Sequence, residues 1–221
     1  LKNGMCVRLI DGYFNRYNFE ADLEKSLMEF RPDIVGISMY SFSRRASLRI
    51  ASRVKELKPD TMIIIGGPHP SLMYADILDQ NASIDLAVIG EGETTMLEIA
   101  KGLPSSKIDG VAYRRNNDIL TTNPRRLIEN LDDIPFPAWH LVDPSKYPPV
   151  GHGVFNGISI DKIPRIAVIF SRGCPFDCAF CSARKVWPRY RHRSGKNMAD
   201  ELELLDKKFN GILNLSLEDA K

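Results

Sequence analysis

The sequence has few cysteines, no long apolar run and almost no charge imbalance, and each shortage excludes a class of protein. Only four cysteines occur, three of them within eight positions, which does not fit the disulfide framework of a small secreted domain. The longest apolar runs, such as IAVIF, are too short to span a bilayer, and no signal-peptide pattern opens the sequence. Lysine and arginine number 30 against 28 aspartates and glutamates, so bulk charge does not indicate a nucleic-acid partner. We therefore expect a globular, cytoplasmic protein without a transmembrane segment and without a nucleic-acid partner.

The first hundred residues alternate between strand and helix patterns. Apolar residues recur at helical spacing in four segments, residues 19–30, 48–59, 71–80 and 93–103. Short apolar runs typical of buried parallel strands lie at residues 6–11, 33–40, 61–67 and 84–90. Repeated strand–helix units with short connections predict an α/β fold with a doubly wound parallel sheet.

The regular alternation of strand and helix patterns ends at about residue 103. Residues 108–122 predict a hairpin that turns at Asn116-Asn117-Asp118, and the proline-rich segment 123–153 predicts a linker across a surface. A strand at 165–173, a helix at 194–209 with Ser194 as N-cap, and a strand at 211–217 then predict the start of a second domain. We expect domains at 1–103 and 165–221, joined by a hairpin and linker at 104–164, and we expect both ends to be cut from a longer chain.

Three cysteines stand in the stretch SRGCPFDCAFCSARK, at positions 174, 178 and 181. Thiolates this close together suit a soft or borderline metal ion. A structural zinc site normally takes four ligands, so zinc would need a further donor such as His192. A [4Fe–4S] cluster usually takes four cysteines, and three would leave one iron open for chemistry. Inert thiols are the remaining alternative.

The segment CPFDCAFC resembles the signature of the radical S-adenosylmethionine (SAM) superfamily, with Phe180 as its aromatic residue. The resemblance implies that this loop follows the first strand of a (βα) barrel, whose functional groups lie at strand ends. It also implies that Cys174, Cys178 and Cys181 hold a [4Fe–4S] cluster, with Phe180 near SAM on the open iron. An electron donor such as flavodoxin or ferredoxin would then drive cleavage of SAM to a 5′-deoxyadenosyl radical.

Three strand ends of the first domain carry glycines: residues 36–41 (GISMYS), 66–71 (GGPHPS) and 90–93 (GEGE). In open α/β sheets, ligands bind at the carboxyl ends of the strands, and glycine permits close approach of the backbone. None of these segments has the G-x-G-x-x-G pattern of a dinucleotide site, so we do not expect a nicotinamide cofactor.

These strand ends resemble the Rossmann-like cobalamin-binding domain that precedes many radical SAM barrels. A Ser-x-Leu segment followed by a Gly-Gly pair is typical of such domains, and here Ser38-Met39-Tyr40 precedes Gly66-Gly67 by 28 positions. The GGPHPS, IGEGE and LDDIPFPAW segments fit the same branch. The resemblance implies a cobalamin site lined by eight residues: Ser38, Tyr40, Gly66, Gly67, His69, Gly90, Glu91 and Gly92.

For two of these residues, His69 and Glu91, the sequence leaves two possible roles open. A D-x-H-x-x-G loop that supplies a histidine to cobalt would fall before Leu1, so this sequence leaves the lower axial ligand open, and the radical SAM branch generally lacks that histidine. His69 follows the Gly-Gly strand, where the nucleotide tail or the corrin edge should lie, so we expect it to make a polar contact rather than to bind the metal. A loop histidine that satisfies local backbone groups is the alternative. Glu91 is either a ligand contact or a carboxylate stabilised at a helix N-terminus.

The combined resemblance implies a cobalamin-dependent radical SAM enzyme acting on a small-molecule substrate, with C-methylation of an unactivated carbon as the reaction. Oxidative ring closure of the anaerobic magnesium-protoporphyrin monomethyl ester cyclase type is a second hypothesis. A non-catalytic cobalamin-binding module with a structural metal site is a third. The methylthiotransferase branch is disfavoured because its N-terminal domain carries three cysteines and this one has only Cys6.

Overall fold

The computed structural model describes residues 4–12, 18–143, 154–155, 158–159, 165–209 and 214–218. The chain divides into two compact units. The first comprises Leu1–Ile10 and Tyr17–Ile128, and the second comprises Asp11–Arg16 and Glu129–Lys221. In the described part of the chain, no helix combines the length and apolar character that crossing a membrane would require.

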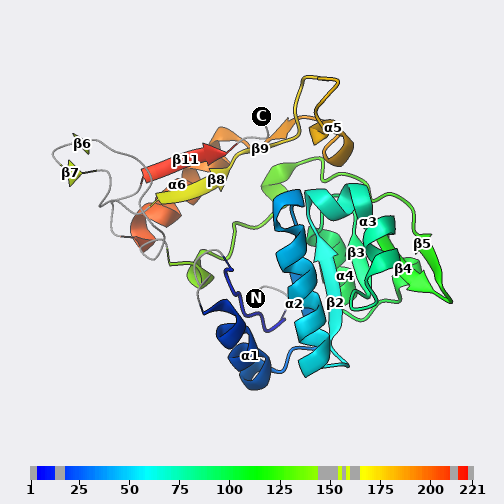
Figure 1. The fold of residues 1–221 in the computed structure, drawn as a ribbon. Helices are drawn as coiled ribbons and strands as arrows, with labels where there is room; N and C mark the ends of the chain where they lie inside the picture. Colours follow the sequence, from blue (N-terminus) through cyan, green and yellow to red (C-terminus); the bar gives the residue numbers. More distant parts are fainter. Residues whose placement is uncertain are drawn as a thin grey trace. The chain divides into compact units, whose positions relative to one another are not determined.

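The first unit is built on a five-stranded mixed sheet (Figure 1). Its strands are β1 (Ile34–Ser38), β2 (Met62–Gly66), β3 (Leu86–Val88), β4 (Val111–Arg115) and β5 (Asp118–Thr121), in that spatial order. The first three strands are parallel, and β4 and β5 add an antiparallel edge. The α/β class expected from the sequence is confirmed, with a sheet that is mostly rather than wholly parallel.

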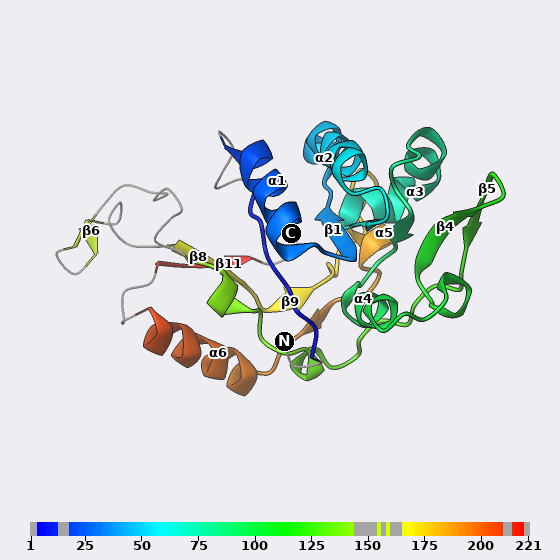
Figure 2. The same ribbon diagram turned by 90° about the horizontal axis from the view of Figure 1, so that it is seen from below.

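Helices cover both faces of this sheet (Figure 2). They are α1 (Phe19–Phe30), α2 (Arg44–Leu57), α3 (Pro68–Gln80) and α4 (Glu93–Ala100), with short 3-10 turns η1 (Ser41–Ser43) and η2 (Ser105–Lys107). The first three helices lie on one face, where α1, α2 and α3 share one hydrophobic core with alternate side chains of β2 such as Ile63 and Ile65. The other face packs Ile64 against Ile99 of α4. Burial of β2 on both faces explains its continuous apolar sequence.

The predicted strand at 6–11 is wrong, because residues 5–11 form no strand. Val7 and Leu9 are 47% and 53% exposed there, so their β-propensity is not supported by packing. The described sheet therefore ends at β1. The expectation that β1 is buried on both faces is wrong for the same reason, since Gly36 and Ser38 are exposed.

The predicted hairpin is confirmed. Arg115 pairs with Asp118, which leaves Asn116 and Asn117 as the two turn residues. Both have positive φ, 51° and 76°, as the favoured two-residue hairpin turn requires, and asparagine tolerates that conformation. The hairpin pairs with β3 and so belongs to the sheet of the first unit.

The second unit contains a β–α–β arrangement, as the sequence predicts. Its elements are β8 (Arg165–Ile169), α6 (Gly195–Lys208) and β11 (Asn214–Glu218), with β11 parallel to β8. The side chain of Ser194 accepts a hydrogen bond from the Asn197 amide, which confirms Ser194 as the N-cap of α6. The remaining elements are β6 (Val154–Phe155), β7 (Ile158–Ser159), β9 (Ser171–Arg172), α5 (Ala183–Val186), β10 (Arg191–His192), η3 (Leu131–Asp133) and η4 (Trp139–Leu141).

The first part of the linker packs into the second unit more closely than a surface crossing would. Leu131 is only 3% exposed, and Trp139 packs against a core formed by Ile166, Val168 and Leu205. Apolar residues among the prolines supply this packing, which periodicity could not reveal because they follow neither a helical nor a strand pattern. Most of the linker after Asp143 lies outside the described residues.

Candidate functional site

The carboxyl ends of β1, β2 and β3 meet at one edge of the first sheet, because the three strands are parallel neighbours. The structure brings the predicted residues of all three strand ends to this edge. The Met39 amide donates to the Gly66 carbonyl at 2.8 Å, and the His69 amide donates to the Met39 carbonyl at 3.3 Å. These two bonds join the loop after β1 to the loop after β2.

Gly67 is the glycine whose position depends most clearly on the absence of a side chain. Its φ is +107°, and an added Cβ would lie 3.0 Å from the Met39 carbonyl oxygen and 3.6 Å from Ser38 Oγ. Gly90 also has positive φ, +77°, but faces open space. Gly66 and Gly92 would each accept a Cβ at ordinary contact distance. The backbone conformation therefore explains why glycine stands at positions 67 and 90. It does not explain the glycines at positions 66 and 92.

Ser71, which was not among the predicted site residues, joins the loops after β2 and β3. Its hydroxyl donates to the Gly67 carbonyl at 2.9 Å and accepts from the Gly90 amide at 3.0 Å. One hydroxyl thus fixes the two positive-φ glycines with respect to each other. Ser71 is the serine of the GGPHPS segment, but no spacing pattern in the sequence predicts its contact with Gly90, 19 positions further along the chain.

His69 makes one side-chain hydrogen bond and leaves one ring nitrogen without a partner. Its Nδ1 lies 3.0 Å from Ser41 Oγ. Its Nε2 is buried and has no hydrogen-bond partner in the described structure. Burial, and to a lesser extent the nearby Arg44 guanidinium, lower the pKa of His69 below its ordinary value, so the ring is neutral near pH 7.

Glu91 has a structural contact. Its side chain is 6% exposed, and Oε2 accepts a hydrogen bond from the Ile128 amide at 2.9 Å. The carboxylate therefore holds the end of the first unit's chain against the loop after β3. This contact accounts for a buried acidic residue at this position without a ligand.

Two aromatic rings stack beside the β1 end. Tyr40 and Phe42 have centroids 5.4 Å apart and an interplanar angle of 16°. They are 48% and 89% exposed, which is unusual for large aromatic side chains. Tyr40 was predicted at the site because it takes the leucine position of a Ser-x-Leu segment, whereas Phe42 belongs to none of the motifs.

The cysteine loop is closed at its base by β9 and β10, which pair through Arg172 with Arg191 and Ser171 with His192. Gly173 follows β9 with φ +83°, and a Cβ there would lie 2.1 Å from the Arg189 carbonyl oxygen. No side chain fits at that distance, so glycine is required where the two ends of the loop approach each other.

The three thiols of this loop are free, and Cys178 and Cys181 are exposed. The Cys181 amide donates to the Cys178 carbonyl at 3.0 Å, and Cys181 Sγ accepts from the Ala183 amide at 3.5 Å. Among the described residues, however, no three histidine, cysteine or acidic side chains are gathered as metal ligands. The structure therefore places the three thiols on one loop without bringing them together. Phe180, between them, is 93% exposed.

The donor set still fits an iron–sulfur cluster by its chemistry. Three accessible, unpaired thiols on one short loop are suitable ligands for a soft metal centre. Free thiols do not attract one another, and metal ligation commonly supplies the free energy that orders its own site. The three thiols would have to come together to hold one metal centre, and metal binding can supply the free energy for that ordering.

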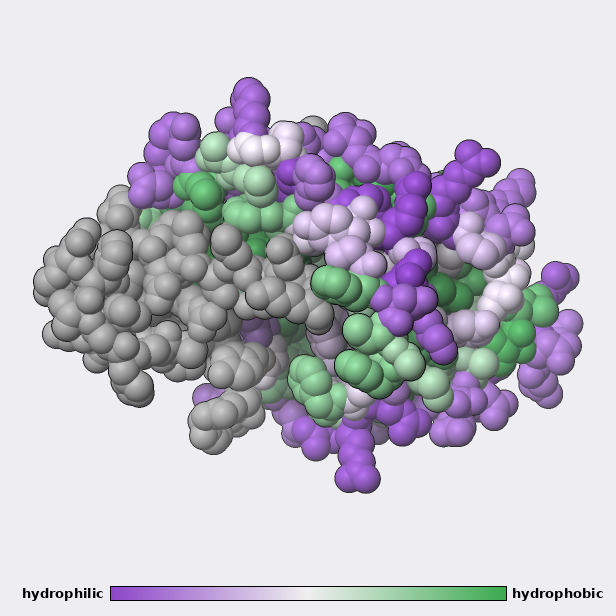
Figure 3. Space-filling model, turned by 90° about the horizontal axis from the view of Figure 1, so that it is seen from above, coloured by the Kyte–Doolittle hydropathy of each residue, from purple (hydrophilic) through white to green (hydrophobic). Residues whose placement is uncertain are grey.

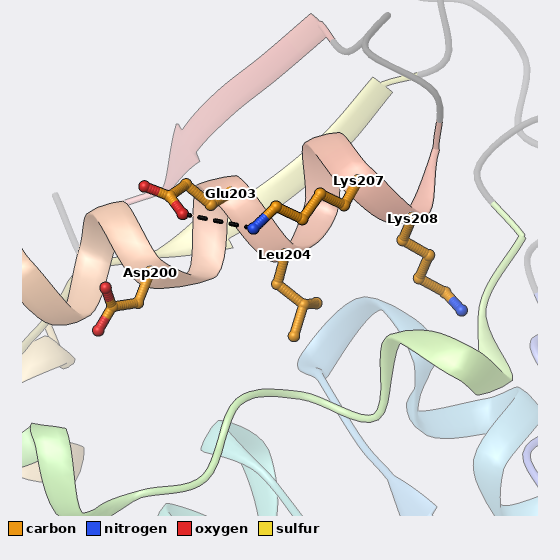
Figure 4. A pocket seen from close by; sticks show the side chains of 5 residues that line it. All are labelled: Asp200, Glu203, Leu204, Lys207 and Lys208. Atoms are coloured by element: carbon orange, nitrogen blue, oxygen red, sulfur yellow. Dashed lines mark ion pairs between the residues drawn. The ribbon is translucent and has the colours of Figure 1, made fainter.

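The surface offers other features that do not coincide with the predicted residues. Hydrophobic patches alternate with hydrophilic ones on the face seen in Figure 3. On α6, a hollow of about 460 Å³ is lined by Asp200, Glu203, Leu204, Lys207 and Lys208 (Figure 4). Its charged groups include the Lys207–Glu203 ion pair at 3.6 Å. All of its lining residues come from one helix, so it provides no enclosed cofactor site.

The chain is similar to several known proteins. Residues 1–100 match the B12 binding domain family. An uncharacterised methyltransferase of Pyrococcus horikoshii is 32% identical over 218 residues, which span 96% of this chain and 45% of the relative. The anaerobic magnesium-protoporphyrin IX monomethyl ester cyclase of Rubrivivax gelatinosus is 32% identical over 197 residues, which span 85% of this chain and 34% of the relative.

A solved structure has the same fold over the whole chain. The radical S-adenosylmethionine methyltransferase TsrM from Kitasatospora setae, determined with cobalamin and a [4Fe-4S] cluster bound, matches with a TM-score of 0.72 and 21% identity. The match covers 100% of this chain and 43% of that one. The chain thus spans less than half the length of the proteins it matches. Together with the B12 binding domain match over residues 1–100, these matches confirm the resemblance of the chain to radical SAM proteins with an N-terminal cobalamin-binding domain.

Proposed function

We propose that the whole protein is a cobalamin-dependent radical SAM methyltransferase that methylates an unactivated carbon of a small molecule. The observation that carries the proposal is the presence, in one chain, of a B12 binding domain and a loop with three free thiols after the strand β8 of a β–α–β unit. The relative from Pyrococcus horikoshii is named a methyltransferase, which supports methyl transfer as the reaction.

The proposed cofactors are a [4Fe–4S] cluster, SAM and cobalamin. When bound, they would supply reductive cleavage of SAM to a 5′-deoxyadenosyl radical and a methyl group held on cobalt. The chain's own part would be to bind and orient them. Cys174, Cys178 and Cys181 would hold three of the four irons and leave the last for SAM, with Phe180 beside it. A flavodoxin or ferredoxin would deliver the electron.

The β1–β3 edge fits cobalamin on two observations. The buried Nε2 of His69 has no hydrogen-bond partner in the described structure, so it is suited to meet a polar group of the cofactor. Gly90, whose φ is +77°, has open space where a Cβ would stand, so a ligand can approach the backbone there. We propose that the site is lined by Ser38, Tyr40, Gly66, Gly67, His69, Gly90, Glu91 and Gly92.

Oxidative cyclisation is the second candidate, because the Rubrivivax gelatinosus relative is named a cyclase and its identity to this chain is also 32%. A non-catalytic cobalamin-binding module with a structural metal site is the third, because the family match covers the B12 binding domain alone. The two alternatives differ from methyl transfer in the fate of the SAM methyl group.

The experiment follows that methyl group. The whole protein would be reconstituted anaerobically with iron, sulfide and hydroxocobalamin, reduced, and incubated with SAM labelled in its methyl group. Methyl transfer predicts label in the corrinoid fraction together with 5′-deoxyadenosine. Formation of 5′-deoxyadenosine without labelled corrinoid would favour the cyclase hypothesis, and the absence of both products would overturn the enzymatic proposal.

The chain provides a matched control for the thiols. Cys6 is free and exposed like Cys178 and Cys181, but it lies in the first unit. We expect Cys178→Ala to abolish 5′-deoxyadenosine formation and Cys6→Ala to leave it unchanged.

A further inference from the structure

A side-chain hydrogen bond between Ser41 and His69 joins the loop after β1 to the helix after β2. Ser41 is the first residue of η1, and His69 is the second residue of α3. Their side chains meet at 3.0 Å, Oγ to Nδ1, across 28 positions of sequence. The contact therefore holds the imidazole in one orientation relative to the strand ends.

The opposite nitrogen of this ring is the unusual one. Nε2 of His69 is the buried side-chain atom that lacks a hydrogen-bond partner in the described part of the chain. Leaving a buried polar atom unpaired is unfavourable, and such atoms in native structures often await a ligand or an ion. Because Nδ1 is occupied by Ser41, any ligand must meet this ring at Nε2.

The surroundings favour an acceptor oxygen as that ligand. Burial, and to a lesser extent the nearby Arg44 guanidinium, lower the pKa of His69 and so disfavour a second proton on the ring, which leaves the imidazole neutral with one N–H. The Ser41 hydroxyl can donate to Nδ1 or accept from it, and when it donates the single ring proton lies on Nε2, which is the arrangement that an oxygen acceptor at Nε2 requires. A cationic neighbour and an N–H donor together attract an oxygen acceptor and oppose a metal cation.

We propose that Ser41 is a positioning residue that fixes His69 as the Nε2–H tautomer, and that Nε2–H donates to an oxygen acceptor on the periphery of the corrinoid. The acceptor is either an amide carbonyl of the corrin ring or the phosphate of the nucleotide tail. This inference rests on the proposed function for its ligand, whereas the tautomer is a property of the protein alone.

The first measurement needs no cofactor. The probe is the whole protein labelled with 15N-histidine, in which His69→Ala identifies the His69 signals among those of the other histidines. Two-bond 15N–1H correlations at pH 7 should show the His69 proton on Nε2 in the wild type and a mixture of both neutral tautomers in Ser41→Ala. A wild-type proton on Nδ1 would overturn the proposal, whether or not the protein binds cobalamin.

The second measurement is binding of hydroxocobalamin, followed by absorbance after equilibrium dialysis. We expect Ser41→Ala to weaken binding roughly 3- to 10-fold, the effect of one hydrogen bond, and to have no further effect in a His69→Ala background. Ser52→Ala is the matched control. Ser52 lies on α2, and its Oγ also contacts a side-chain oxygen, Ser83 Oγ, at 3.2 Å. Equal binding by wild type and Ser41→Ala, or additive losses, would refute the inference.

Cobinamide, which lacks the nucleotide tail, distinguishes the two acceptors. A loss on Ser41→Ala with both corrinoids supports a ring amide, and a loss with cobalamin alone supports the phosphate. If the wild type binds neither corrinoid while the tautomer is as expected, the proposed function fails and the Ser41–His69 pairing stands.

Discussion

Trp139 donates a hydrogen bond from Nε1 to the carboxylate of Glu201 at 2.8 Å, and that carboxylate is only 1% exposed. The second oxygen of Glu201 pairs with Arg193, whose guanidinium lies over the rings of Phe136 and Phe170. Phe136 and Trp139, both in the linker, thus contact the two partners of a buried ion pair in the second unit. This arrangement gives the IPFPAW segment a structural function.

Breaking the Glu201 contacts should destabilise the second unit. Glu201→Gln leaves the Arg193 charge without its counter-charge in a buried site, and we expect a loss of about 3 kcal/mol in the free energy of unfolding. Trp139→Phe leaves one buried carboxylate oxygen without its donor and should cost about 1–2 kcal/mol. Urea denaturation followed by circular dichroism measures both.

Glu203→Gln is the control for this prediction. Glu203 is on the same helix, α6, but its pair with Lys207 is exposed, so its loss should be barely measurable. A loss for Glu203→Gln as large as that for Glu201→Gln would show that burial of the ion pair is not what matters.

Asp132 provides a pH-dependent contribution to stability. Hydrogen bonds from Ser194, including its amide at 2.9 Å, hold the pKa of Asp132 below its ordinary value of 3.8. The folded state therefore favours the carboxylate, and this stabilisation is present above pH 3.8 and is lost as the pH falls through the lower folded-state value. Wild type should be more stable than Asp132→Asn at pH 7, with the difference disappearing in acid. A difference that grew on acidification would contradict this assignment.

Gly173 should be indispensable to the cysteine loop. Gly173→Ala would place a Cβ 2.1 Å from the Arg189 carbonyl oxygen, so the β9–β10 base of the loop must open. We expect loss of iron incorporation on anaerobic reconstitution. Gly102→Ala is the control, because Gly102 also has positive φ, +79°, but a Cβ there meets nothing within 4 Å. Similar iron content in the two variants would show that the close approach is not required.

Sequence patterns predicted the regular elements well where packing and local chemistry agreed. The helical spacing in 19–30 corresponds to α1 (Phe19–Phe30), and the Asn116-Asn117 turn and the Ser194 cap depend on local rules that a sequence displays directly. The strand at 6–11 failed because its apolar residues find no partner in the described structure. Strand propensity is not enough without a neighbouring strand.

The site was predictable in its location and not in its contacts. Parallel strand ends must share an edge, so residues 38–40, 66–69 and 90–92 could be grouped from the order of elements alone. The Ser41–His69 and Ser71–Gly90 contacts depend on side-chain placement across 28 and 19 positions, and no periodicity encodes them. The cysteine motif specifies three ligands at a fixed spacing, and it did not predict that the three thiols lie apart on their loop.

The central claim is that Cys174, Cys178 and Cys181 close around one iron–sulfur cluster with an open iron. Metal analysis and electron paramagnetic resonance of the anaerobically reconstituted, reduced whole protein test it most directly. The account predicts about four irons and four sulfides per chain, and a cluster signal that shifts when SAM is added. The Cys6→Ala variant should give the same result, and alanine at any of the three loop positions should abolish it. Zinc in place of iron, or a cluster signal that SAM leaves unchanged, would contradict the account.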